Sequence, residues 1–295
     1  MEAYIRTGKR RVFRYRINPG RFSAFLATVL ALFLLTYVLL SWDSLFYRQY
    51  SLSEFDSRVL EEYFTAEQDQ GVPWYYLAAV DRAEEIPPEG ISRERSSAVA
   101  LHLRGIQKPD EIRELLKTYK DDSRFLKKVV QEVKKFKNLK AIYENKVFPI
   151  APGYEYDYEN GYGEGRSFGG ERKHEGIDIM CAKGVPLVSV CDGVIEKKGW
   201  NTLGGWRLGI RGEDGIYYYY AHLSMYNDKL QEGDPVVKGQ VIGFAGDSGY
   251  GEEGTIGQFE PHLHFGMYEG KDMKPVNPYP FLKVWERKTF EELTK

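Results

Sequence analysis

Net charge is nearly absent from this chain of 295 residues. Its 41 Lys and Arg and 43 Asp and Glu residues give a formal net charge of −2. No nucleic-acid partner is therefore expected, because such partners call for an excess of basic residues. Internal repeats and low-complexity tracts are also missing, and the length suits two modest domains with accessory segments.

Charge is missing altogether from one stretch near the N-terminus, Phe22 to Ser41. At about 1.5 Å per residue, a helix of this length matches a bilayer core of about 30 Å. Basic residues precede the stretch and acidic residues follow it, which places the N-terminus in the cytoplasm. We expect a cytoplasmic tail at residues 1–21 and a transmembrane anchor at residues 22–42. The rest of the chain would then lie outside the cell membrane.

A cleaved signal peptide and a buried core helix both fit the uncharged stretch less well than an anchor. A signal peptide would have an apolar run of about 7–15 residues and small residues at a cleavage site. The run here is longer, and Ser41-Trp42-Asp43 offers no such site. No cysteine follows for lipid attachment, which excludes a lipoprotein. A buried core helix is rarely uncharged on every face.

Cysteine occurs only at Cys181 and Cys191. Outside the cytoplasm the two could form a disulfide, because they flank a predicted strand and could meet across neighbouring strands. They could equally be buried free thiols. Cys181 also follows Asp178 closely enough to be a fourth metal ligand, although a closed four-ligand site would be structural rather than catalytic.

Residues 43–146 are predicted to form a small all-helical domain. Apolar residues recur at helical spacing after a predicted N-cap at Ser53, and a second helix begins at Val72-Pro73. A helix from Ser123 carries lysines opposite its apolar face, which indicates a solvated surface or a dock for anionic polymer or lipid headgroups. The domain could act as a spacer, an inhibitor or a dock for a protein partner.

Two features of the helical domain invite a catalytic interpretation. The segment from Gly71 to Glu85 resembles the helix that carries the catalytic glutamate of lytic transglycosylases, with Glu84 and Glu85 at the matching place. The serine usual after that glutamate is missing, and no Gly-Leu-Met-Gln-like segment follows. We therefore favour a packing helix over a bifunctional enzyme. His102 stands without partner histidines and is interpreted as structural.

From Pro149 onward glycine and tyrosine become dense, and short β-type runs alternate with turn signals. Residues 147–285 are therefore predicted to form an all-β domain of antiparallel sheets, with a tail at residues 286–295. The predicted strands cover residues 185–190, 194–197, 206–211, 216–222, 241–245 and 262–268. Tyr154, Tyr156 and Tyr158 are expected in the core or at the surface rather than on a substrate.

Four of the five histidines lie in three short segments of this domain: His174 to Asp178, Tyr220 to Leu223, and Pro261 to Phe265. Side chains alternate along a strand, so His262 and His264 share a face. His174 and Asp178, in an expected loop around Gly176, could converge on one ion with a histidine of that pair. Two imidazoles and a carboxylate suit zinc and leave a fourth position for water.

The spacing His174-x-x-x-Asp178 with His262-Leu263-His264-Phe265 resembles the signature of the M23 family of zinc metallopeptidases, the lysostaphin- and LytM-type peptidoglycan endopeptidases. The similarity extends over nearly all of residues 166–285. It implies a LytM-like fold, with one zinc ion on His174, Asp178 and His264. It also implies that His222 and His262 orient or deprotonate the attacking water and stabilise the oxyanion.

Additional segments resemble the sporulation L-alanyl-D-glutamate endopeptidases, among them residues 166–172, residues 204–211 and Asn277-Pro278-Tyr279-Pro280. The resemblance implies hydrolysis of peptidoglycan stem peptides in cell-wall or spore-cortex remodelling. The loop from Tyr250 to Glu260 is longer than usual in the family, and Gly266 replaces a typical glutamate. The alternative is a non-catalytic envelope scaffold or a regulator of another wall hydrolase.

Overall fold

The computed structural model describes residues 19–40, 48–106, 108 and 111–293. The predicted cytoplasmic tail therefore lies outside the described residues up to position 18. The chain divides into two units, residues 1–47 and residues 48–295. Each unit is described by itself.

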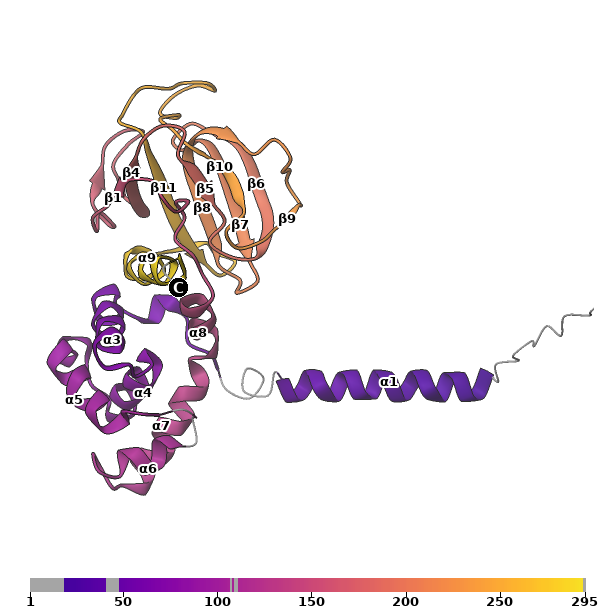
Figure 1. Cartoon of the computed structure of the whole chain (residues 1–295), viewed down its shortest axis with the longest axis vertical. Helices are drawn as coiled ribbons and strands as arrows, with labels where there is room; N and C mark the ends of the chain where they lie inside the picture. Colours follow the sequence, from indigo (N-terminus) through magenta and orange to yellow (C-terminus); the bar gives the residue numbers. More distant parts are fainter. Residues whose placement is uncertain (1–18, 41–47, 107, 109–110, 294–295) are drawn as a thin grey trace, which may run out of the picture. The chain divides into compact units, whose positions relative to one another are not determined.

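The first unit contains helix α1, Pro19–Leu40, over most of the predicted anchor (Figure 1). Side chains are described for residues 25–37 of this helix, and large apolar ones such as Phe25 and Phe33 are exposed. Within the described residues, no helix combines the length and the apolar character that crossing a membrane requires.

The second unit begins with helices, as predicted. They are η1 (Leu52–Glu54), α3 (Ser57–Gln70), α4 (Trp74–Glu84), η2 (Pro88–Gly90), α5 (Arg93–Leu103), α6 (Ile112–Leu116), α7 (Ser123–Lys135) and α8 (Lys137–Glu144). The N-cap of α3 is Asp56, which accepts from the Arg58 amide, rather than the predicted Ser53. Gly71 ends α3 in the left-handed conformation that glycine adopts without strain.

Antiparallel strands follow, which confirms the predicted order of helical and β regions. They are β1 (Tyr156–Asp157), β2 (Gly165–Arg166), β3 (Arg172–Lys173), β4 (Gly176–Cys181), β5 (Pro186–Val188), β6 (Gly193–Asn201), β7 (Gly205–Gly212), β8 (Tyr217–Tyr226), β9 (Pro235–Val236), β10 (Val241–Ala245), β11 (His262–Glu269) and β12 (Lys274–Val276). The main sheet has the order β1-β4-β11-β8-β7-β6-β9, while β2 and β3 pair separately.

Strand β11 lies between β4 and β8 in the main sheet. Its register places His264 opposite Asp178 on one side and opposite Ala221 on the other. Residues directly opposite one another in an antiparallel pair project to the same face of the sheet. The three histidine-bearing segments of the sequence are thus brought to neighbouring positions by strand pairing.

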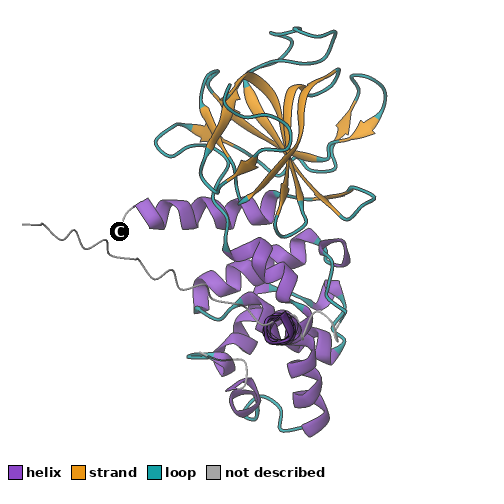
Figure 2. Ribbon diagram, turned by 90° about the vertical axis from the view of Figure 1, so that its right-hand side faces the viewer, coloured by secondary structure: helices purple, strands orange, loops and turns teal. Residues whose placement is uncertain are grey.

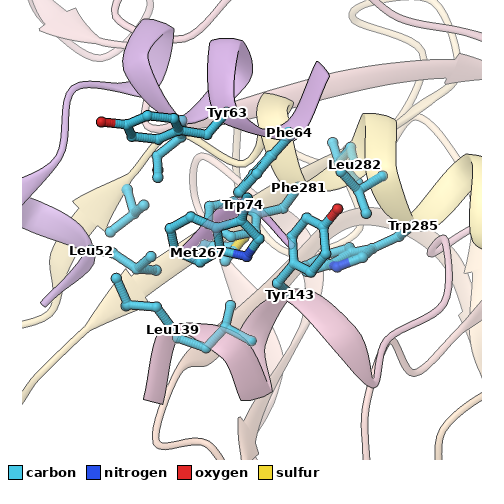
Figure 3. Close-up of a cluster of buried hydrophobic side chains, with 14 of the residues drawn as sticks. Leu52, Tyr63, Phe64, Trp74, Leu139, Tyr143, Met267, Phe281, Leu282 and Trp285 are labelled. Carbon is cyan, nitrogen blue, oxygen red and sulfur yellow. The ribbon is translucent and has the colours of Figure 1, made fainter. Parts of the chain in front are cut away.

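Residues 286–293, predicted as part of a tail, form the second half of helix α9, Tyr279–Leu293. The helix forms because one of its faces is buried, with Phe281, Leu282, Val284 and Trp285 at most 1% exposed. The Phe281 ring lies 5.4 Å from Phe64 of α3, and the Trp285 ring lies 6.2 Å from Tyr218 of β8. Figure 2 shows α9 between the sheet and the remaining helices, and Figure 3 shows the shared cluster of buried side chains.

The helical and β regions of this unit are joined by polar contacts as well. Tyr156 and Tyr158 donate to the two carboxylate oxygens of Glu286, at 3.0 and 2.8 Å. Glu269, the last residue of β11, accepts from the Ser51 hydroxyl and from the amides of Leu52 and Ser53 at 2.9 and 3.2 Å. The helices and the sheet consequently form one compact unit rather than two separable ones.

Both cysteines are free thiols. Cys191 is buried and Cys181 is partly buried. Burial raises the pKa of Cys181 to about 11 and that of Cys191 to about 12, because a thiolate loses its hydration there. Of the two alternatives, the structure shows the unpaired thiols.

Candidate metal centre

Asp178 lies on strand β4 and not in the expected loop. The segment is a strand because it pairs with β1 on one side and with β11 on the other. Gly176 is required at its start, since a Cβ there would lie 2.5 Å from the Phe265 carbonyl oxygen and 2.7 Å from the His264 ring. The glycine suggested a turn, but its role is to admit the imidazole of the facing strand.

Three possible ligand atoms meet at one point beside β4 and β11. His174 Nε2 lies 3.0 Å from Asp178 Oδ1 and 2.9 Å from His264 Nδ1, and the last two atoms are 2.9 Å apart. His174 comes from the short connection between β3 and β4 and is 2% exposed. His174, Asp178 and His264 are the three candidate ligands that the sequence singled out.

The chemistry of these three atoms fits a cation. His174 Nδ1 lies 2.9 Å from the carbonyl oxygen of Gly161, to which its N–H can donate, and this tautomer leaves Nε2 as an acceptor. Burial would raise the pKa of Asp178, but the neighbouring imidazoles of His174 and His264 outweigh it and hold the pKa well below its usual range. Burial lowers the pKa of His264 more than Asp178 raises it. An ionised carboxylate and two neutral imidazoles are the donors that zinc takes.

Cys181 does not join this cluster within the described part of the chain. It stands three positions after Asp178 on the same strand, and side chains alternate along a strand. Cys181 and Asp178 therefore project to opposite faces of the sheet, and the interpretation of Cys181 as a fourth ligand is wrong.

Arg166 is a site residue that the sequence analysis did not identify. Its Nη2 lies 3.1 Å from Asp178 Oδ2 and 3.0 Å from His174 Nδ1, and its Nη1 lies 3.2 Å from Glu164 Oε2. The guanidinium thus holds the oxygen of Asp178 that faces away from the other two ligand atoms. Partners of this kind fix the orientation of metal ligands.

His222 and His262 lie beside the three ligand atoms, with their ring centroids 4.7 Å apart. Their Nδ1 atoms lie 2.7 Å from the Ser248 carbonyl oxygen and 2.8 Å from the Glu260 carbonyl oxygen. In a neutral imidazole, donation from Nδ1 to such a carbonyl leaves Nε2 without a proton. Burial, followed by the neighbouring His262 and His264, lowers the pKa of His222 to about 3, so its imidazole is neutral at pH 7. His222 also has a φ of 64°, a strained value for a residue with a Cβ.

A pocket of about 620 Å³ is lined by the three candidate ligands together with His222 and His262. One wall is aromatic: the Tyr250 ring lies 5.9 Å from His222 and 4.9 Å from Phe259, and Phe168 stacks on Tyr250 at 4.3 Å. Tyr250 and Phe259 belong to the long loop noted in the sequence. The unusual length of this loop was the only sign in the sequence that it could shape the pocket. The sequence did not indicate that Tyr250 and Phe259 would be the residues that line it.

Glu84 of helix α4, a residue at the place of a transglycosylase's catalytic glutamate, does not line this pocket. It accepts from Tyr119 at 2.8 Å, Arg95 at 2.8 Å and Lys120 at 3.0 Å. Burial alone would raise the pKa of Glu84, but these donors together lower it. A catalytic acid needs a carboxyl group that is protonated near neutral pH. Glu84 is instead an ionised structural group, which supports the packing-helix interpretation.

The pocket, its candidate ligands and the antiparallel sheet together define the class of protein, a metallopeptidase-type domain. Comparison with known families agrees. Residues 172–278 match the model of peptidase family M23, so this part of the chain is similar to the M23 peptidase domain.

Several known proteins are similar to this chain over part of its length. The L-Ala--D-Glu endopeptidase of Bacillus subtilis is 47% identical over 147 residues, which are 49% of this chain and 45% of that protein. Lysostaphin of Staphylococcus simulans is 35% identical over 133 residues, 43% of this chain and 25% of its own length. The chain thus spans less than half of these two relatives.

Solved structures also match. A crystal structure from Ruminococcus gnavus, provisionally described as a glycyl-glycine endopeptidase lytM, has 33% sequence identity and a TM-score of 0.47. The match covers 74% of this chain and 89% of that one. The catalytic domain of S. simulans lysostaphin has 34% identity and a TM-score of 0.36, covering 44% of this chain and 92% of that domain.

Proposed function

We propose that the chain is a zinc endopeptidase that hydrolyses the L-Ala–D-Glu amide bond in the stem peptides of peptidoglycan. The observation that carries this proposal is the convergence of His174 Nε2, Asp178 Oδ1 and His264 Nδ1 within 3.0 Å at the wall of a pocket. The choice of bond is supported by the 47% identity to the L-Ala--D-Glu endopeptidase of B. subtilis.

His174, Asp178 and His264 would hold one zinc ion per chain. Zinc bound by three protein ligands supplies a Lewis acid for a carbonyl oxygen and lowers the pKa of a water molecule to roughly 7. The unprotonated Nε2 atoms of His222 and His262 can orient that water and accept its proton. An imidazole that has accepted a proton can then donate a hydrogen bond to the oxyanion or a proton to the leaving amine.

We also propose that the chain is attached to the cell membrane through residues 22–42, with its N-terminus in the cytoplasm and the peptidase domain outside. The uncharged stretch at residues 22–41 and the basic residues before it support this arrangement. Protease treatment of intact, wall-stripped cells tests it. Degradation of the β domain with protection of an N-terminal tag is the expected result, and full protection of the chain contradicts the proposal.

The activity is tested on the full chain purified in detergent. Zinc-loaded protein, with and without a chelator, is incubated with purified muropeptides, and products are identified by mass spectrometry. We expect release of the part of the stem peptide that follows L-alanine, and we expect the chelator to prevent it. A zinc-loaded chain that cuts no muropeptide would favour the alternative of an envelope scaffold or a regulator of another wall hydrolase. A role in sporulation is proposed from the sequence resemblance, and a protein partner is proposed for the helical region, residues 43–146.

A further inference from the structure

The small β2–β3 hairpin brings two arginines to the pocket. Arg166 of β2 and Arg172 of β3 are directly opposite one another in its register. Opposite residues in an antiparallel pair project to the same face. Both side chains line the pocket that contains His174, Asp178 and His264.

The two arginines differ in how their charge is balanced. Arg166 is paired with Asp178 and with Glu164. Arg172 forms no ion pair with a described residue; its Nη2 lies 3.5 Å from the Tyr250 hydroxyl, a long and uncharged contact. The Nε of Arg172 is buried without a hydrogen-bond partner. A buried donor left unpaired is costly, so the Nε of Arg172 calls for an explanation.

Tyr250 places Arg172 on the aromatic side of the pocket. The Tyr250 ring contacts His222 at 5.9 Å and is stacked against Phe168 at 4.3 Å. The guanidinium of Arg172 therefore adjoins the side chain that contacts His222, while Arg166 is paired with Asp178. Of the two arginines, Arg172 is thus the one without an ion pair to a described residue, at the wall of the pocket where an amide would be cut.

The proposed substrate offers a matching anion. A glutamyl residue after the scissile bond contributes its amine to that bond and one of its two carboxyls to the onward chain. Its other carboxylate stays free, close to the scissile amide. The fork of a guanidinium binds a carboxylate through two parallel charge-assisted hydrogen bonds.

We propose that Arg172 binds this free carboxylate and selects a glutamyl residue on the leaving side of the cut. The inference rests on the proposed function and adds to it the residue that recognises the glutamyl carboxylate of the substrate. Ile or Gly at the same position of a substrate would leave Arg172 unpaired inside the pocket.

Two synthetic peptides test the proposal on the zinc-loaded full chain in detergent. One contains the L-Ala–D-Glu bond with the free carboxylate, and the other is identical except that this carboxylate is a primary amide. Wild type is expected to cut the carboxylate peptide with a kcat/KM about 10- to 100-fold higher, the range for a charge-assisted pair. Arg172→Gln is expected to lose that preference and to cut the amide peptide within about twofold of wild type. Arg172→Lys, which keeps a point charge without the fork, should retain part of the preference.

Lys229→Gln is the matched control, because it removes one positive charge from an exposed residue outside the pocket. It should keep the wild-type preference. Equal losses on both peptides in Arg172→Gln, or an unchanged preference, would overturn the inference and leave the proposed function standing. Failure of wild type to cut either peptide would overturn the proposed function, and the inference with it. Arg172→Lys decides the matter if Arg172→Gln does not fold, since an unchanged or wholly absent preference in that variant also contradicts the proposal.

Discussion

The Nε2 atom of His174 lies 2.9 Å from the Nδ1 atom of His264. Both atoms also lie within 3.0 Å of the same oxygen of Asp178. Because the N–H of His174 is directed to Gly161, its Nε2 has only a lone pair to offer. Lone pairs at this separation repel unless a proton or a cation lies between them, and the three atoms can occupy three corners of a tetrahedral metal site.

Zinc should therefore stabilise the protein through Asp178. At a free zinc concentration 100 times the Kd, binding adds about 2.7 kcal/mol to the free energy of unfolding. For a unit of this size we expect a rise in Tm of roughly 5–10 °C, measured by differential scanning calorimetry. Asp178→Ala should abolish the rise, and Cys181→Ser should keep it. The same rise in Asp178→Ala would mean that zinc binds elsewhere.

Removing Arg166 should weaken zinc binding by disordering Asp178. Arg166→Gln loses the contact of 3.1 Å to the second oxygen of that carboxylate. Loss of such a partner typically lowers metal affinity about 10- to 100-fold. Competition with a chromophoric chelator measures the change, and Arg166→Lys should restore part of it. Tighter binding in Arg166→Gln would show that repulsion between the guanidinium and the metal outweighs the orienting effect.

His222 and His262 should be needed for hydrolysis without being needed for metal. We expect His222→Ala and His262→Ala to retain one zinc per chain by elemental analysis, while kcat falls about 10²- to 10⁴-fold. His102→Ala is the control, since His102 contacts Thr118 in the helical region. Loss of zinc from either pocket variant would place that histidine among the ligands instead.

The ionised Glu84 carboxylate should contribute stability that is lost as the pH falls into the acid range. Its pKa is lowered in the folded protein, so its stabilisation is complete above the unfolded pKa of about 4.5 and is lost as pH falls through the folded pKa. Tm should consequently decrease with falling pH below about 4.5 more steeply in wild type than in Glu84→Gln. Circular dichroism melts from pH 7 to pH 3 measure the slopes. Glu85→Gln is the control, because the Glu85 carboxylate is exposed and its pair with Lys128 is screened by salt.

Trp285 should be among the largest single contributors to the stability of the compact unit. Its side chain is fully buried between Tyr218 and Phe265 of the sheet and Phe281 of its own helix. Trp285→Ala should lower the free energy of unfolding by about 3–5 kcal/mol, measured by urea denaturation. A loss below about 1 kcal/mol would mean that α9 is not part of the core.

The sequence predicted what depends on local pattern. The Asp214-Gly215 turn separates β7 from β8, in line with the expected alternation of strands and turns, and the clustered histidines led to the pocket. Strand β4 was missed because Gly176 is a turn signal by itself, and only the facing ring of His264 explains it. Helix α5 was missed because its buried face is built from small residues such as Ser96 and Ala100, which give a weak periodic pattern.

Arg166 and Arg172 are the two ends of the segment 166–172, which carried part of the family resemblance, but the sequence assigned neither arginine to the site. Arginine is ordinarily a surface residue, and nothing in its neighbours along the chain distinguishes one that lines a pocket. Their roles follow from the pairing of β2 with β3, which the sequence does not reveal because each strand has two residues. The same holds for α9, whose burial depends on two regions that meet only in the folded chain.

The hydrogen bonds from Ser51, Leu52 and Ser53 to Glu269 have a mechanical consequence. Glu269 ends the strand that carries His264, five residues away, a distance of about 17 Å at roughly 3.3 Å per residue. Tension applied to the chain before Arg48 would first meet Gln49 and Tyr50, which hydrogen-bond to α7, and then the contacts of Ser51 to Ser53 with the end of β11. The strand that aligns the ligand is therefore among the elements that share this load, and force along the chain is a variable that can reach the pocket.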